Sequence, residues 1–236
     1  MEQQLPPPLT YSSYEVVRST WLTRPTKSVS ALATVGWTCL LSLGALVYLW
    51  NVGDIAQFMD ASRENIFNQH QVWRLWTTLF AHGDFGHLAS NIMLFFILGF
   101  FLNGYFGWRL FPLGAFFWGG VTNLISLWSS DPDVSLIGAS GIVYWMGGVW
   151  LVLYFLLSKQ KNISQRWIRS LGVGLMIFMP AQAFEPRTSY RTHFIGFALG
   201  MVCGLWHYYR HRKKFRSAEI REKIYEEILP IEGALP

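Results

Sequence analysis

The sequence predicts an all-α membrane protein built as a bundle of six transmembrane helices. Of its 236 residues, 52% are hydrophobic and only 14% are charged, whereas soluble domains carry about 25% charged residues. A membrane-spanning helix needs about 20 predominantly apolar residues. Runs of this kind occur six times, at about 30–50, 86–106, 109–128, 137–157, 167–183 and 190–209. These runs fill most of the chain, so we expect a single helical bundle.

The basic residues predict the orientation of the bundle. Lys and Arg accumulate in cytoplasmic loops, and alternating the loops across six spans places most of them on one side, including those at 159–169 and 210–216. We therefore expect both termini in the cytoplasm. The net charge of +5 then indicates contact with anionic membrane lipid. The sequence contains no nucleic-acid-binding motif, so we expect no nucleic-acid partner.

The two ends of the chain are predicted to lie outside the bundle. Residues 1–28 include a run of three prolines and favour a flexible cytoplasmic N-terminal segment without a signal peptide. Residues 29–209 form the expected six-helix domain. Residues 210–236 are basic at first, and Ile220, Ile224 and Ile228 then recur every four residues. This spacing predicts an amphipathic cytoplasmic tail.

The first loop, residues 51–84, is neither polar enough for a simple linker nor apolar enough to span. Val72, Trp73, Trp76, Leu79 and Phe80 recur at three- and four-residue spacing. This pattern predicts a helix in the membrane interface, with its tryptophans at headgroup level. Arg74 is interpreted as an anchor to lipid phosphate or to backbone, not as a catalytic group.

Two polar residues open the second span. His87 and Asn91 are four residues apart, so they share one helical face about one turn inside the outer boundary. Polar groups at that depth need partners or water. They either bond to a neighbouring element or serve a reaction. The histidines His70, His82 and His87 lack acidic or thiolate partners at useful spacing, so we expect neither a metal nor a cofactor.

The fourth span opens with Gly138-Ala139-Ser140-Gly141, followed by Tyr144 one turn later. A serine among small residues at the start of a membrane helix has two interpretations. It can serve only packing or capping, because small residues let helices approach closely. It can also be a nucleophile, provided that a base lies beside it.

The sixth span supplies a candidate base at the same depth. His193 shares a face with Gly196, Gly200 and Gly204, and this glycine stripe permits close approach of a partner helix. Spans two, four and six run in one direction, so residues near their starts share one level. If Gly141 and the glycines at 147–148 meet the stripe of the sixth span, Ser140 and His193 come within hydrogen-bond reach.

This arrangement favours acyl transfer. Neutral histidine suits the task of removing the serine proton near pH 7, so His193 would be the general base. The Ser140 backbone N–H, with the side chains of His87 and Asn91, would stabilise the oxyanion. No acidic residue lies near His193 in the sequence in an orienting role. We therefore expect a Ser-His dyad, with Tyr144 as ring support for the histidine.

These residues together resemble the rhomboid family of intramembrane serine proteases. The resemblance covers about residues 30–209 and is carried by Trp73-Arg74, His87 with Asn91, the Gly138–Gly141 motif with Tyr144, and His193 with Gly196 and Gly200. It implies a rhomboid-type six-helix bundle that cleaves single-span membrane proteins in or near the outer part of the bilayer. Ser140 would be the nucleophile and His193 the base, with His87 and Asn91 stabilising the oxyanion. Trp73 and Arg74 match a structural motif.

Two positions depart from the pattern of the family. Asn103 stands where many relatives carry an acidic residue, which predicts a weaker hydrogen-bond network at the inner end of the second span, and Thr192 precedes the histidine where alanine is frequent. Two other hypotheses remain beside the protease: a catalytically silent relative that binds membrane clients, and a small transporter. The transporter is disfavoured because the polar groups gather near one surface and not at the midplane. The expected location is a bacterial inner membrane.

Overall fold

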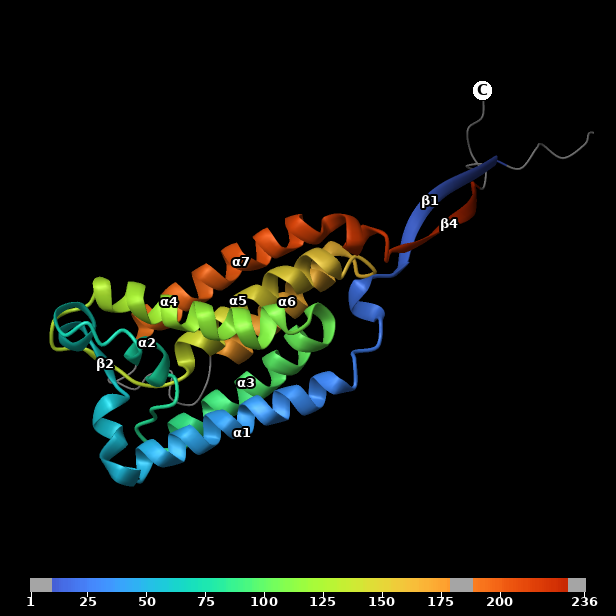
Figure 1. The fold of residues 1–236 in the computed structure, drawn as a ribbon. Coiled ribbons are helices and arrows are strands. Elements are labelled where there is room, and N and C mark those ends of the chain that lie inside the picture. The colour runs from blue at the N-terminus through green and yellow to red at the C-terminus, as the bar shows by residue number, and fades with distance from the viewer. Residues whose placement is uncertain (1–9, 179–188, 229–236) are drawn as a thin grey trace, which may run out of the picture.

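The computed structural model describes residues 10–178 and 189–228, and this part of the chain is mainly helical (Figure 1). The long helices are α1 (Val29–Leu49), α3 (Phe85–Phe106), α4 (Ala115–Trp128), α5 (Ser140–Leu157), α6 (Ile163–Phe178) and α7 (Tyr190–Arg216). The irregular helical segment η4 (Arg109–Gly114) leads directly into α4. Each of these helices overlaps one of the six predicted apolar runs, although residues 179–183 of the fifth run lie outside the described residues.

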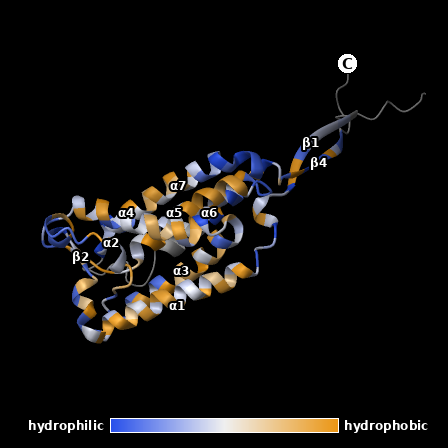
Figure 2. Cartoon of the chain, viewed as in Figure 1, coloured by the Kyte–Doolittle hydropathy of each residue, from blue (hydrophilic) through white to orange (hydrophobic). Residues whose placement is uncertain are grey.

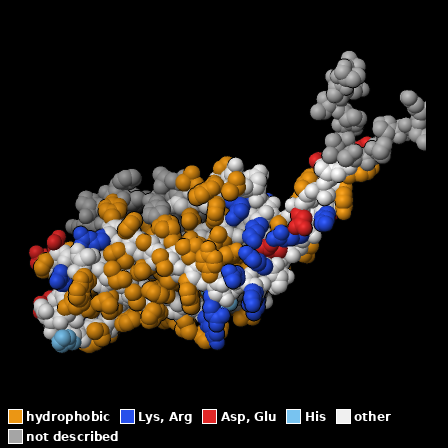
Figure 3. All heavy atoms as spheres, turned by 90° about the horizontal axis from the view of Figure 1, so that it is seen from above, with side chains coloured by type: hydrophobic (Ala, Val, Ile, Leu, Met, Phe, Trp, Pro, Cys, Tyr) orange, Lys and Arg blue, Asp and Glu red, His pale blue; other side chains and the backbone are white. Residues whose placement is uncertain are grey.

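Four of these elements are long and apolar enough to cross a membrane: α1, α3, η4 together with α4, and α5. Hydrophobic residues are spread along the bundle in Figure 2, and in Figure 3 they cover the visible flank. Lys and Arg gather at one end of that flank (Figure 3). The chain is thus a multi-pass membrane protein, while the crossing of the membrane by α6 and α7 stays a prediction.

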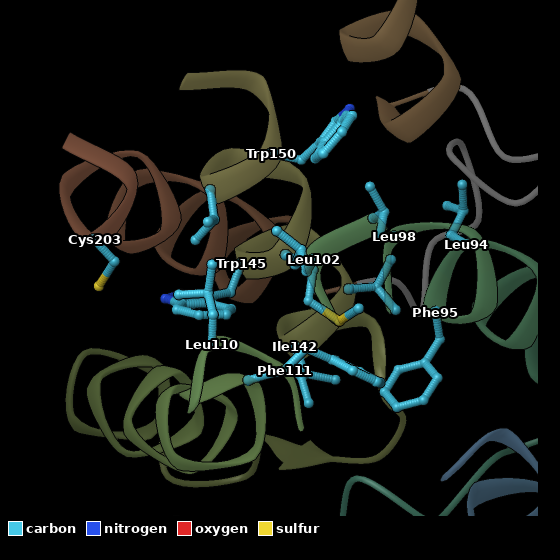
Figure 4. Packing of buried hydrophobic residues seen from close by; sticks show 14 of the residues in the cluster. Leu94, Phe95, Leu98, Leu102, Leu110, Phe111, Ile142, Trp145, Trp150 and Cys203 are labelled. Atoms are coloured by element: carbon cyan, nitrogen blue, oxygen red, sulfur yellow. The ribbon is translucent and has the colours of Figure 1, made fainter. Parts of the chain in front are cut away.

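Helix α5 lies at the centre of the bundle. All ten residues from Gly141 to Trp150 are buried, and Ile142, Trp145 and Trp150 pack with side chains of α3 and η4 (Figure 4). Against α7 the contact is backbone to backbone, because a Cβ atom on Gly200 would overlap the Trp145 carbonyl and one on Gly148 would overlap the Phe197 carbonyl. The predicted meeting of the two glycine stripes is confirmed.

The first loop folds into short elements: η2 (Val52–Phe58), β2 (Ala61–Ser62), η3 (Glu64–Asn68) and α2 (Arg74–Thr77). Strand β2 pairs with β3 (Ser135–Leu136) from the loop before α5. Of the helix predicted over residues 72–80, only the one turn of α2 is formed. Arg74 is buried and donates to the carbonyls of Gln57 at 2.9 Å and Asp60 at 3.0 Å. Arg74 therefore anchors the backbone of the first loop, which is one of the two roles predicted for it.

The terminal segments form a β-ribbon, which differs from the flexible segment and amphipathic tail expected from the sequence. Strand β1 (Thr10–Ser19) pairs antiparallel with β4 (Ile220–Ile228), with Tyr14 opposite Ile224 (Figure 1). A spacing of four residues fits one helical turn and equally two repeats of a strand. The isoleucines therefore did not distinguish the two structures, and the pairing partner lies about two hundred residues away in the sequence.

An ionic cluster attaches this ribbon to the bundle. The side chain of Glu219 is only 5% exposed and accepts from Lys159 at 2.6 Å and from Arg221 at 2.8 Å. Burial raises the pKa of Glu219, but the hydrogen bonds from Lys159 and Arg221 outweigh it and hold the pKa below its usual range. The cluster thus stabilises the fold when Glu219 is ionised.

Replacing Lys159 by alanine is expected to loosen the β-ribbon. A hydrogen bond between charged groups contributes about 1.5–3 kcal/mol, so the amide protection factors of residues 220–228 should fall about tenfold or more in hydrogen exchange. Because the folded-state pKa of Glu219 is lowered, the stabilisation is complete above about pH 4.3 and is lost as the pH falls through the lower folded-state value. Wild-type protection should therefore drop as the pH falls below about 4.3.

The matched control is Arg18→Ala. Arg18 pairs with Glu222 at 2.5 Å, but both side chains are more than half exposed, and exposed pairs contribute about 0–1 kcal/mol. Equal loss of protection in the two variants would contradict a special role for the buried cluster.

Candidate active site

The site residues lie at the starts of α3, α5 and α7, which all begin at the end of the bundle near β2 (Figure 1). Asp84 caps α3 by accepting from the His87 backbone N–H at 2.8 Å. Ser189 caps α7 by accepting from the Thr192 N–H. Helix α5 begins at Ser140 itself, directly after Ala139. The predicted common level of these three helix starts is confirmed.

Helices α5 and α7 bring Tyr144 and His193 together. The two rings stack with centroids 4.1 Å apart and planes 9° apart. One turn further along α7, a Cβ atom on Gly196 would lie 2.5 Å from the Gly141 carbonyl oxygen, so only glycine allows this approach. Ser140 lies beside Gly141 and one turn before Tyr144, and Ser140 and His193 are both half-buried. Gly141 and Tyr144, which follow Ser140 on α5, thus contact the turn of α7 that carries His193.

His87 and Asn91 converge on the loop before Ser140. A Cβ atom on Gly138 would lie 2.6 Å from His87 Cε1 and 3.7 Å from Asn91 Nδ2. Gly138 also has φ of +109°, in the region that favours glycine. Within the described part of the chain, the buried Asn91 Nδ2 has no hydrogen-bond partner. A buried donor without a partner is costly, and this one is aimed at the residues that precede the candidate nucleophile.

The first loop holds this glycine in place, which the sequence did not reveal. The Thr78 hydroxyl is buried and donates to the Leu136 carbonyl, while the Gly138 N–H donates to the Thr78 carbonyl at 3.0 Å. About sixty residues separate these partners in the sequence, and a threonine in an apolar stretch carries no signal of such a contact. The supporting role of the first loop is therefore exerted through Thr78 as well as Arg74.

His82 is a second residue that the sequence did not single out for the site. Its side chain is fully buried, and its ring lies 5.0 Å from that of His87. Nδ1 lies 3.2 Å from the Phe80 carbonyl, so Nδ1 carries the proton of this bond. Burial lowers the pKa of His82 to about 4, so the ring is neutral near pH 7. It therefore places a neutral ring beside His87.

The predicted site residues are not all equally close to Ser140. Gly138, Gly141 and Tyr144 are its neighbours along the chain and Gly196 contacts Gly141, whereas Gly200 packs one turn further along α7 against Trp145. Its role is helix packing. In the described part of the chain, no group of three or more His, Cys, Asp or Glu side chains is placed to hold a metal ion.

A comparison with protein families bears on this arrangement. The model of the Rhomboid domain matches residues 69–210, which is 142 of the 236 residues and so more than half of the chain. A comparison with curated proteins finds no match. The matched region contains all three helix starts that form the site, and the chain belongs to the rhomboid family.

Proposed function

We propose that this protein is an intramembrane serine endopeptidase that cleaves single-span membrane proteins in or near the outer part of the bilayer. Ser140 is the nucleophile and His193 the general base of a two-residue dyad. The observation that carries the proposal is the stacking of Tyr144 on His193 at 4.1 Å, beside the close approach of Gly141 and Gly196. A histidine in this position needs a fixed ring plane to accept a proton from a neighbouring hydroxyl.

The reaction begins when His193 takes the Ser140 proton and Oγ attacks the scissile carbonyl. Tyr144 orients the imidazole by stacking, the task that an acid performs in a triad. The carbonyl oxygen gains negative charge and is stabilised by the Ser140 N–H at the start of α5, by Asn91 Nδ2 and by His87. His193 then returns the proton to the leaving amine. Water hydrolyses the acyl-enzyme by the same steps.

The membrane arrangement follows from the same proposal. All six long helices cross the bilayer, the site faces the outside, and the basic end of the bundle with both termini faces the cytoplasm, as the positive-inside rule requires. The partners are single-span substrate proteins and membrane lipid. The host membrane is a bacterial inner membrane.

The test is labelling of the purified protein in detergent with a fluorophosphonate or isocoumarin probe. These reagents phosphonylate or acylate an activated serine, so the wild type should be labelled and Ser140→Ala should not. Ser90→Ala is the matched control, because Ser90 Oγ donates to the His87 carbonyl within its own helix. Equal labelling of wild type and Ser140→Ala, or none of either, would reject the protease and leave a client-binding relative.

A further inference from the structure

Three hydroxyl side chains form a continuous hydrogen-bonded chain next to His193. Ser126 Oγ lies 2.5 Å from Thr192 Oγ1, which lies 2.7 Å from Ser189 Oγ. Ser126 is fully buried and Thr192 is 4% exposed. We call Ser126, Thr192 and Ser189 the hydroxyl chain. It connects the first turn of α7 to the last turns of α4.

The hydroxyl chain fixes the rotation of α7 in a way that the glycine stripe does not. Glycines allow two helices to approach closely, but they have no side chains that interlock, so they leave rotation and sliding open. A buried hydroxyl that loses its partner costs about 1–3 kcal/mol. In the observed setting of α7 against α4, Ser126 and Thr192 satisfy each other across the two helices.

This rotation decides where the imidazole points. Thr192 and His193 are neighbours on α7, so their side chains leave the helix about 100° apart. Thr192 points to Ser126 on α4, while His193 lies against Tyr144 on α5. The backbone of the same turn is held as well, because the His193 N–H donates to the Ser189 carbonyl at 3.2 Å. Turning α7 so that His193 left Tyr144 would break the bond between Thr192 and Ser126.

We propose that Ser126 and Thr192 are a positioning pair for the reaction. Their hydrogen bond sets the rotation of the first turn of α7 and so holds the His193 imidazole toward Ser140. Neither side chain contacts the reacting atoms. The proposal rests on the proposed function, because it assigns a role in the reaction of Ser140 and His193.

The test is Thr192→Val, which replaces the hydroxyl by a methyl group of similar size. A misplacement of about 1 Å in an active site can cost about a hundredfold in rate. We expect kcat for a single-span reporter in proteoliposomes to fall about tenfold or more, with KM changed less than about twofold, and probe labelling to slow in parallel. Thr192→Ser keeps the hydroxyl and should restore kcat to within about threefold of wild type.

Ser126→Ala removes the other half of the same bond. It should lower kcat to a similar extent, and the double variant Ser126→Ala/Thr192→Val should be no slower than the slower single variant, since both changes remove one interaction. The matched control is Thr122→Val. Thr122 is also buried on α4, but its hydroxyl donates to the Trp118 carbonyl of its own helix at 2.8 Å, so kcat should stay within about twofold.

The outcomes separate this proposal from the proposed function. Wild-type kcat in Thr192→Val and Ser126→Ala, or an equal loss in Thr192→Ser and Thr192→Val, overturns the positioning pair. If wild type is labelled and Ser140→Ala is not, the protease stands under either result. An unlabelled wild type rejects both proposals. Thermal unfolding of each variant identifies a folding defect, and if Thr192→Val does not fold, Ser126→Ala and its rescue by Ser126→Thr decide the question.

Discussion

Replacing His193 by alanine is expected to abolish cleavage of a single-span reporter while leaving the bundle folded. Removing the base of a serine-histidine pair leaves the serine hydroxyl protonated, and such losses reach about 10⁴-fold or more in kcat. His193 is half-buried and contacts Tyr144 through ring stacking, while the close contacts of α5 and α7 are made by Gly141, Gly196 and Gly200. The helix pair should therefore survive the change. Cleavage in proteoliposomes, together with thermal unfolding, measures both effects.

His207 provides the matched control for this variant. It lies on the same helix, near the opposite end, and its ring contacts Phe106 and His211. His207→Ala removes an imidazole of the same kind without touching the site, so its kcat should stay within about threefold of wild type. The double variant Ser140→Ala/His193→Ala should be no less active than either single variant, because residues that act as one unit are not additive. Residual cleavage above about 1% of wild type in His193→Ala would contradict the assignment of the base.

The membrane class and the candidate site residues could be proposed from the sequence because both are encoded locally. Long apolar runs identify spans, and a histidine or serine at the start of such a run is conspicuous in a chain with few polar groups there. The common direction of three spans then placed these residues at one level. The glycine stripes also predicted the close approach of α5 and α7, because glycines such as Gly141 and Gly196 leave room for two backbones to meet.

The remaining features depend on partners that are distant in the sequence. Thr78 supports Gly138 across about sixty residues, and Thr192 meets Ser126 across 66. A hydroxyl in a membrane helix usually bonds to the backbone of its own helix, as Thr122 does. The sequence therefore does not distinguish such a hydroxyl from one that bonds to another element. The β-ribbon was missed for a similar reason, because β1 and β4 carry no turn between them that would mark them as a pair.

Asn103 shows what a departure from the family pattern means physically. The sequence suggested a weaker hydrogen-bond network at the inner end of α3, because an amide replaces an acid there. In the structure, Asn103 is buried and its Nδ2 donates to the Phe111 carbonyl at 2.8 Å. The amide thus ties α3 to η4 directly, without needing a charged partner.

Replacing Asn91 by alanine is expected to lower kcat about 10²- to 10³-fold with little change in KM, the usual effect of losing one oxyanion donor. Asn103→Ala is the matched control, because Asn103 is also a buried asparagine on α3. We expect Asn91→Ala to lose activity and keep its stability, and Asn103→Ala to lose stability and keep its activity. Asn103 makes its bond in the resting fold, so its loss should cost about 1–3 kcal/mol of stability and leave kcat within about threefold.

The resting fold explains this contrast. Within the described residues, Asn91 Nδ2 has no partner, so removing it leaves no broken hydrogen bond at that atom, and thermal stability should be kept or slightly raised. An interaction that forms only in the transition state lowers kcat without a matching cost in folding. Reporter kinetics and thermal unfolding on both variants decide the matter. A loss of stability in Asn91→Ala as large as that in Asn103→Ala, with kcat unchanged, would make Asn91 a structural residue and move the oxyanion donor elsewhere.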